Sequence, residues 1–270
     1  MDWRLNARAA IGRAYPRVVG GLREPSWLLF DIFLPLMGIA AFVYYYKAMD
    51  APEVFTGFVI IGGTMTAYWL NVLWSMAAQF YWEKEVGNLQ LYLIAPMSRM
   101  SVLAGMALGR MFFTSVRAVS TLLLGIVIFQ VQMTVHSPLL LALVFVFTLI
   151  ALYGMGMMFS SLYLLYGRDA WNMSNLLQEP IYFLSGFYFP VRALGFWVAG
   201  AASVVPITLG LDAMRQLLFG SGAAMGFLGV ELELVIIVVL AAVFLVGARY
   251  ALRYMEELGK KEGRLTLRWQ

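Results

Sequence analysis

Long apolar runs separated by short polar segments dominate the chain. Most runs are long enough to cross a hydrocarbon core of about 30 Å as a helix rising 1.5 Å per residue. They lie at about residues 27–46, 54–80, 101–129, 139–165, 172–189 and 230–252. The pattern predicts an all-α membrane protein, in which residues 25–255 form one domain of six transmembrane helices and residues 256–270 form a cytoplasmic tail.

The first 24 residues alternate basic and apolar positions at helical spacing. Pro16 predicts a kink, and the period predicts an amphipathic helix that lies in the membrane interface. A disordered basic tail is the alternative. The basic residues are Arg4, Arg8, Arg13, Arg17 and Arg23, and the apolar ones are Trp3, Ala7, Ala10, Ala14 and Val18.

The segment 190–220, before the last span, is apolar but interrupted. Its apolar run 193–205 is too short to cross the bilayer, and Pro190 and Pro206 break it. We expect a pair of short re-entrant helices on the outer side, packed against protein or a wet cavity.

Composition excludes several classes of protein. The chain is 62% hydrophobic and 13% charged, whereas soluble domains are about a quarter charged. Cysteine is absent and His136 is the single histidine, so we expect no metal site, and we assign no catalytic residue. The net charge of +4 reflects topology and contact with membrane lipids, and we expect no nucleic-acid partner.

Lysine and arginine positions predict the orientation. Cytoplasmic loops carry the excess of basic residues. With both termini inside, the cytoplasmic ends hold fifteen basic residues, and the outer ends hold Lys47, Arg192 and Arg215. We therefore expect a multi-pass protein of the cell inner (plasma) membrane with both termini in the cytoplasm.

The segment 81–98 lies between two spans on the cytoplasmic side. Val86, Leu89 and Leu93 recur at helical spacing, which predicts a short helix that ends before Pro96. Its acidic residues, Glu83 and Glu85, would lie at its N-terminal end, where the helix dipole favours them. Such a helix either rests at the lipid headgroups or projects into a groove of a cytoplasmic partner.

Two blocks of sequence resemble the permeases of ABC type-2 transporters. The first is the run from Glu83 to Leu91 followed by Ala95-Pro96-Met97-Ser98-Arg99, which is similar to the segment after the second span in that family. The chain departs from the family pattern at Asn88, Gln90 and Ala95. The second block, before the last span, resembles the outer region of the family; it contains Ser185, Gly186, Pro190, Pro206, Asp212 and Arg215.

The resemblance implies a non-catalytic membrane subunit of an ATP-driven exporter. A coupling helix at about 81–98 would dock on a cytoplasmic ABC ATPase subunit, with a second contact in the loop 166–173. The implied coupling residues are Glu83, Lys84, Glu85, Gly87, Asn88, Leu89, Pro96, Arg99, Arg168 and Asp169. Two ATPase copies and a second permease copy, giving a homodimer or a heterodimer with a sibling permease, are implied as well.

The sequence itself also indicates that ATP is hydrolysed by another chain. A phosphate-binding loop reads G-x-x-x-x-G-K-[ST], and no such motif occurs in the chain. No cofactor is therefore expected on this chain, and ATP and Mg would be bound by the partner subunit. The resemblance, rather than the residues themselves, implies an amphipathic or lipid-like substrate: a drug, a lipid or a lipid-linked glycan.

Charged and polar residues inside the spans are few. Asp31, Arg117 and Glu179 are the charged ones, and a pair of Asp31 with Arg117 would reduce the cost of burying either charge. A further set, Trp69, Asn71 and Trp74 in the second span, would line a substrate path or simply pack. An ion-coupled secondary transporter and a membrane-embedded lipid-modifying enzyme are the alternative functions.

Overall fold

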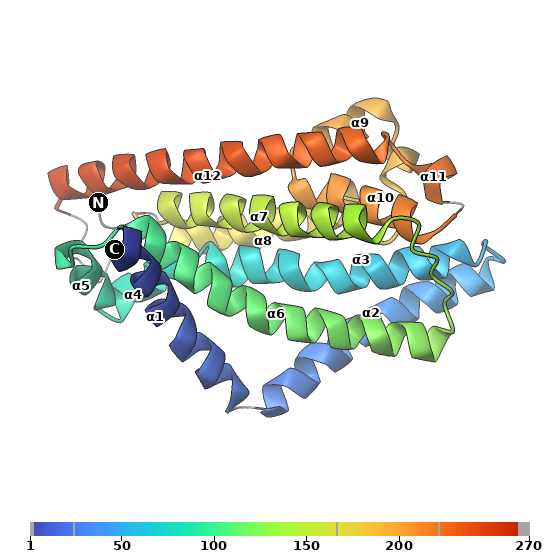
Figure 1. The fold of residues 1–270 in the computed structure, drawn as a ribbon, viewed down its shortest axis with the longest axis horizontal. Helices are drawn as coiled ribbons and strands as arrows, with labels where there is room; N and C mark the ends of the chain where they lie inside the picture. The colour runs from blue at the N-terminus through green and yellow to red at the C-terminus, as the bar shows by residue number, and fades with distance from the viewer. Residues whose placement is uncertain (1–2, 24, 166, 221, 264–270) are drawn as a thin grey trace.

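Most of the long helices of the computed structural model lie roughly along one axis, whereas the first two slope away from it and meet in a V (Figure 1). The structure describes residues 3–23, 25–165, 167–220 and 222–263, without the side chains of residues 22, 25–28, 167–171, 173 and 223. Every regular element within these residues is a helix. The helices are α1 (Trp3–Leu22), α2 (Pro25–Ala48), α3 (Val54–Leu70), the π-helix η1 (Asn71–Met76), α4 (Gln79–Glu85), α5 (Asn88–Ile94), α6 (Arg99–Phe129), α7 (Pro138–Leu162), α8 (Gly167–Leu184), the 3-10 helix η2 (Val191–Leu194), α9 (Phe196–Ala202), α10 (Pro206–Leu218), α11 (Gly222–Met225) and α12 (Val230–Lys261).

Five helices in the described residues are long and apolar enough to cross a membrane: α2, α6, α7, α12 and the run Val54–Glu85 formed by α3, η1 and α4. Helix α8 covers the expected fifth span but is not among them, because polar residues such as Asn172, Ser174 and Glu179 lower its hydropathy. The bent pair α9 and α10 would be a sixth if counted as one span. The fold is that of an all-α membrane protein, as predicted.

The second span forms the centre of the packing. In the most apolar 18-residue stretch of this span, 89% of the residues are buried inside the protein. The corresponding share is 11% for α2 and 22% for α6 and α12. Glycines allow close approach here: a Cβ on Gly62 would lie 1.4 Å from the carbonyl oxygen of Phe187, and one on Gly63 would lie 2.3 Å from Ile39. Helices with exposed apolar faces therefore surround a protein-packed α3.

Helix α1 packs across α6 through small residues on both helices. A Cβ on Gly105 would lie 2.2 Å from the carbonyl oxygen of Ala10, and one on Gly109 would lie 2.9 Å from that of Ala14. Glycines four residues apart thus face alanines four residues apart, which lets the two backbones touch. The helical alternative for the N-terminus is confirmed over residues 3–22.

Several segments meet at one end of the molecule. The start of α1, helices α4 and α5, and the last turns of α12 lie at the left of Figure 1. Asn6 accepts a hydrogen bond of 2.9 Å from the backbone N–H of Ser98, and Arg99 forms an ion pair with Glu256 of α12. Helices α9 and α11 lie at the opposite end. We call these the α5 end and the α9 end.

The expected re-entrant segment 190–220 contains two short helices at a sharp angle. Helices α9 and α10 meet at 113° across a short break. Pro206 is the first residue of α10 and Pro190 precedes η2, which are positions where proline loses no helical hydrogen bond. The predicted pair of short helices is therefore present at the α9 end.

Candidate functional site

The predicted coupling segment consists of two short helices rather than one. Helix α4 continues the second span to Glu85, and Gly87 then adopts a left-handed conformation with φ of 87°. Glycine takes this conformation without a steric penalty, and α5 starts at the next residue. Glu83 and Glu85 therefore lie at the C-terminal end of α4. The prediction that they lie at the N-terminal end of the short helix is wrong, because the second span extends further than its apolar residues do.

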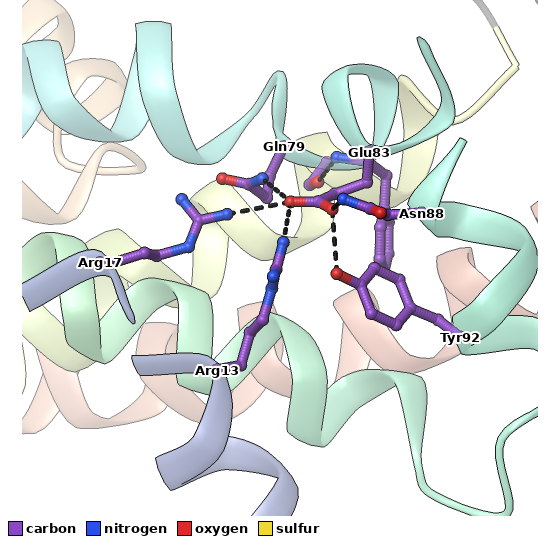
Figure 2. Close-up of polar contacts among 8 residues, drawn as sticks. Arg13, Arg17, Gln79, Glu83, Asn88 and Tyr92 are labelled. Carbon is purple, nitrogen blue, oxygen red and sulfur yellow. Dashed lines mark hydrogen bonds and ion pairs between the residues drawn. The ribbon is translucent and has the colours of Figure 1, made fainter. Parts of the chain in front are cut away.

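The carboxylate of Glu83 is buried and accepts five hydrogen bonds (Figure 2). Its donors come from α1, α4 and α5. They are Arg13 and Arg17 (3.1 Å) on α1, Gln79 (2.9 Å) on α4, and Asn88 (3.1 Å) and Tyr92 (2.9 Å) on α5. We call these six residues the Glu83 cluster. One carboxylate thus joins the N-terminal helix to both parts of the coupling segment.

Burial and neighbouring charges act on the pKa values of the Glu83 cluster. Burial and the neighbouring Glu83 carboxylate raise the pKa of Tyr92, so its hydroxyl stays a donor. Burial lowers the pKa of Arg17 to about 10, assisted by Arg110 and Arg13 and opposed by Glu83. Arg17 is therefore cationic near neutral pH. Arg13 also lies 5.3 Å from the centre of the Tyr92 ring, a cation–π distance.

An exposed apolar surface covers the outside of the coupling segment. Ile94 is 81% exposed, Val86 69% and Leu91 59%, and Trp82 is exposed beside them. We call these four residues the α5 surface. Leu89, in contrast, is buried. The coupling segment thus places one apolar face in the protein and another outward at the α5 end.

The other predicted coupling residues have different positions. Lys84, Glu85, Gly87 and Asn88 are partly buried, Pro96 is exposed, and Arg99 is paired with Glu256. The side chains of Arg168 and Asp169 lie outside the described part of the structure. The carboxylate of Glu83 is enclosed by the cluster. No group of three or more potential metal ligands occurs among the described residues.

Two of the predicted outer-region residues, Arg215 and Gly186, are in direct contact. The guanidinium of Arg215 is buried and donates to four carbonyl oxygens, those of Phe58 (2.9 Å), Gly186 (2.7 Å), Phe187 (2.6 Å) and Phe189 (3.1 Å). Gly186 has a positive φ of 63°, which turns the chain around the guanidinium. Arg215 thereby fastens the turn after α8 to α3.

Two further polar contacts complete the outer region. Thr208 of α10 donates to the carbonyl of Ala202 (2.8 Å) and shares a hydrogen bond with the hydroxyl of Ser185 (2.9 Å). Asp212 accepts from the backbone N–H of Phe227 (2.8 Å) and from Gln216 (2.9 Å). These contacts hold the bent pair α9 and α10 in place. Ser185 and Asp212 of the predicted outer region therefore have hydrogen-bond partners within the protein.

The structure contains the Asp31–Arg117 ion pair suggested by the scarcity of charge. Nη1 of Arg117 lies 3.0 Å from Oδ2 of Asp31, and Nη2 donates to the carbonyl of Ala67 (2.9 Å). Glu179 on α8 is exposed and accepts a hydrogen bond from Gln178 (3.0 Å). Arg110 lies about two helical turns before the paired Arg117 on α6 and was not among the functional residues suggested by the sequence.

The three candidate path residues differ in their surroundings. Trp69 is fully buried within the core, which favours packing. Trp74 donates through its indole N–H to Gln178. Asn71, the first residue of the π-helix, accepts a hydrogen bond of 2.9 Å from Tyr153 and borders a cavity that also touches Asp31 and Arg117. Local π-helices are frequent at functional sites, which directs attention to that cavity.

Comparison with known proteins identifies the family. No curated protein and no solved structure matches the chain. The family model described as ABC-2 type transporter matches residues 20–219, which extend from the last turn of α1 through α10 and include both blocks of the resemblance. The chain therefore belongs to the ABC-2 type transporter family and is a multi-pass membrane component of a transporter.

Proposed function

We propose that this chain is the permease subunit of an ABC exporter, driven by ATP that a separate subunit hydrolyses. The α5 surface carries the proposal. It presents apolar side chains outward at the α5 end, from α5 and from the end of α4, where the Glu83 cluster fastens both helices to α1. Exposed apolar residues grouped on one surface are typical of a protein-binding site.

The sequence supports a separate motor, because it has no phosphate-binding loop. ATP and Mg would be bound by the ATPase, and the assembly would contain two ATPase copies and two permease copies. In this proposal the α5 surface, rather than the Glu83 carboxylate, touches the ATPase. Glu83 instead transmits the position of α5 to α1.

The chain would lie in the inner (plasma) membrane of the cell. In the proposed orientation its α5 end faces the cytoplasm. Both the start of α1 and the last turns of α12 lie at this end. The excess of basic residues in the segments assigned to this side supports the same orientation.

An apolar cavity supports an amphipathic or lipid-like substrate. The cavity has a volume of about 480 Å³ and lies between α3, α6, α7 and α10 toward the α9 end. Its lining includes Ile61, Met65, Leu122, Phe145 and Met214. An apolar cavity of this size accepts a hydrocarbon chain more readily than an ion, which favours export of a drug, a lipid or a lipid-linked glycan over ion-coupled transport of a small polar solute.

Site-specific photo-crosslinking in intact cells tests the proposal. A photoreactive amino acid would replace Leu91 or Ile94, and adducts would be identified by mass spectrometry. We expect an adduct with a chain that contains a phosphate-binding loop. Trp197 on α9, 85% exposed at the opposite end, is the matched control and should give no such adduct. Absence of a phosphate-loop chain from the Leu91 and Ile94 adducts would contradict the proposal.

Substitution tests the same surface quantitatively. Replacing Leu91 and Ile94 together by serine removes two large exposed apolar side chains, each contributing about 1.5–3 kcal/mol if fully buried by a partner. We expect the ATPase identified by crosslinking to co-purify at least about tenfold less efficiently. Replacing Phe196 and Trp197 by serine is the control and should leave co-purification unchanged.

A further inference from the structure

A cavity rich in arginine lies where α1, α2 and α6 meet. Its volume is about 330 Å³. Arg17 and Gly20 of α1 border it on one side, Asp31 of α2 on another, and Arg110 and Arg117 of α6 on a third. Asn71 and Thr114 add neutral polar groups to the lining. We call this the arginine cavity.

Positive charge in the arginine cavity is not neutralised by the protein. The lining contains three arginines and one carboxylate. Asp31 is paired with Arg117, and Arg17 bonds to Glu83 outside the cavity. The guanidinium of Arg110 is exposed and has no carboxylate or hydrogen-bond partner among the described residues. An uncompensated guanidinium beside two others favours an anionic ligand.

The depth of the arginine cavity matches a lipid headgroup. Helices α2 and α6 end at Ala48 and Phe129 at the α9 end. About 20 residues span a hydrocarbon core of about 30 Å. Counting back that far from each helix end reaches the neighbourhood of Asp31 and Arg110. The mouth of the cavity would therefore lie near the inner boundary of the hydrocarbon core.

Exposed apolar side chains flank the arginine cavity on two helices. Leu108 and Phe112 lie on α6 on either side of Arg110 in sequence, and each is about half exposed; Phe30 and Leu34 flank Asp31 on α2 and are about two-thirds exposed. A hydrocarbon chain can lie against such surfaces while its polar head enters the cavity. This combination of cations and exposed apolar surface fits an amphiphile better than a free ion.

We propose that the arginine cavity binds the phosphate-bearing headgroup of an anionic amphiphile, with Arg110 as its main contact and Arg17 and Arg117 as further donors. Guanidinium groups match phosphate oxygens in a bidentate arrangement. The hydrocarbon part of the ligand lies along α2 and α6. Binding of the amphiphile does not depend on the proposed function. The statement that this ligand is the transported substrate does rest on it, and it means that the substrate is anionic.

The test measures lipid binding to the purified full-length protein by native mass spectrometry. The probes are dioctanoyl phosphatidic acid, dioctanoyl phosphatidylcholine, which has no net charge, and inorganic phosphate. We expect phosphatidic acid to bind at least about tenfold more tightly than phosphatidylcholine, since phosphatidic acid carries net negative charge whereas the phosphate of phosphatidylcholine is offset by its own choline cation. Equal affinities for the two lipids would overturn the proposal. If inorganic phosphate competes as well as the lipid does, the cavity is a site for a free anion, and the proposal that it binds a lipid headgroup is overturned.

Variants locate the binding. Arg110→Gln should weaken phosphatidic acid binding about tenfold, and Arg110→Lys, which keeps the charge but not the bidentate fork, should retain only part of it. Arg8→Gln is the control, because Arg8 is exposed on α1 away from the cavity lining. Asp31→Asn removes the one carboxylate of the lining and should tighten binding several-fold. Wild-type affinity in Arg110→Gln, or an equal loss in Arg8→Gln, would place the lipid elsewhere and overturn the assignment.

Crosslinking at Leu91 in the same Arg110→Gln background separates this inference from the proposed function. We expect the phosphate-loop adduct to persist while phosphatidic acid binding falls. If the adduct forms and phosphatidic acid shows no preference in the wild type, the arginine cavity assignment alone fails. If phosphatidic acid binds as expected and no adduct forms, the site stands and the exporter function fails.

Discussion

The hydroxyl of Tyr92 lies 2.9 Å from Oε2 of Glu83, across the glycine that separates α5 from α4. This hydrogen bond connects α5, which carries exposed apolar residues, to the buried carboxylate of Glu83. Tyr92 faces inward and is nearly buried, whereas Leu91 beside it faces outward. The part of the α5 surface formed by Leu91 and Ile94 therefore lies on a helix whose other side is bonded to Glu83.

Replacing Glu83 by glutamine should destabilise the protein. The variant keeps the shape of the side chain but removes the charge that two arginines face. Breaking a buried ion pair costs about 3–5 kcal/mol; here the arginines retain some solvent, so we expect about 2 kcal/mol, measured as a lowered Tm of the detergent-purified protein. Glu85→Gln is the control in the same turn and should leave the Tm unchanged. Equal effects of the two variants would contradict the cluster.

Arg215→Lys should destabilise the outer region. A lysine ammonium has three donors and cannot reproduce the planar fork that reaches four carbonyl oxygens. Each buried carbonyl left without a donor costs about 1–3 kcal/mol, so we expect a loss of about 3 kcal/mol, followed by thermal unfolding in detergent. Arg192→Lys, an exposed arginine that donates to the Ala224 carbonyl, should change stability by less than about 0.5 kcal/mol. A tolerated Arg215→Lys would show that its hydrogen bonds are not required.

Exchanging the charges of Asp31 and Arg117 tests their ion pair. Arg117→Asp alone would place two carboxylates together near the hydrocarbon core, and we expect little folded protein in the membrane fraction. Adding Asp31→Arg should restore part of the yield and of the Tm, although the bond from Arg117 to the Ala67 carbonyl stays lost. A double variant that is no more stable than the single ones would contradict a direct interaction.

Gly105→Ala should displace α1 from α6. The added methyl group would lie 2.2 Å from the carbonyl oxygen of Ala10, and backbone cannot yield as a side chain would. We expect a lower Tm and faster proteolysis within α1, despite the better helix propensity of alanine. Gly12→Ala is the control, since a Cβ there has no neighbour within 4 Å and should stabilise the helix by about 1 kcal/mol. Similar behaviour of both variants would contradict the close contact.

The features that sequence predicted are those set by local composition. The length of apolar runs determines where helices can span, so the long helices and the break at Pro206 were predictable. The Asp31–Arg117 pair followed from the scarcity of partners in the spans. The fifth span is the exception: α8 is helical as expected, but its polar residues make it less apolar than the other long helices.

The features that sequence did not predict depend on distant contacts. Glu83 is buried because α1 brings Arg13 and Arg17 to it across about 70 residues of sequence, and nothing near Glu83 indicates that approach. The packing of Gly105 on Ala10 that makes it possible is equally remote. The arginine cavity was missed for the same reason, since Arg17 and Arg110 become significant only when α1 and α6 meet.

Arg17 takes part in both the Glu83 cluster and the lining of the arginine cavity. A single guanidinium shared by two sites couples them thermodynamically, and such coupling is reciprocal. An anion bound in the cavity as proposed would draw Arg17 away from Glu83 and loosen the tie between α1 and α4, and a displacement of Glu83 would release Arg17 toward the anion by the same free energy. Arg17, which helps to hold α1 on Glu83, would thus connect binding in the arginine cavity to the position of the coupling segment.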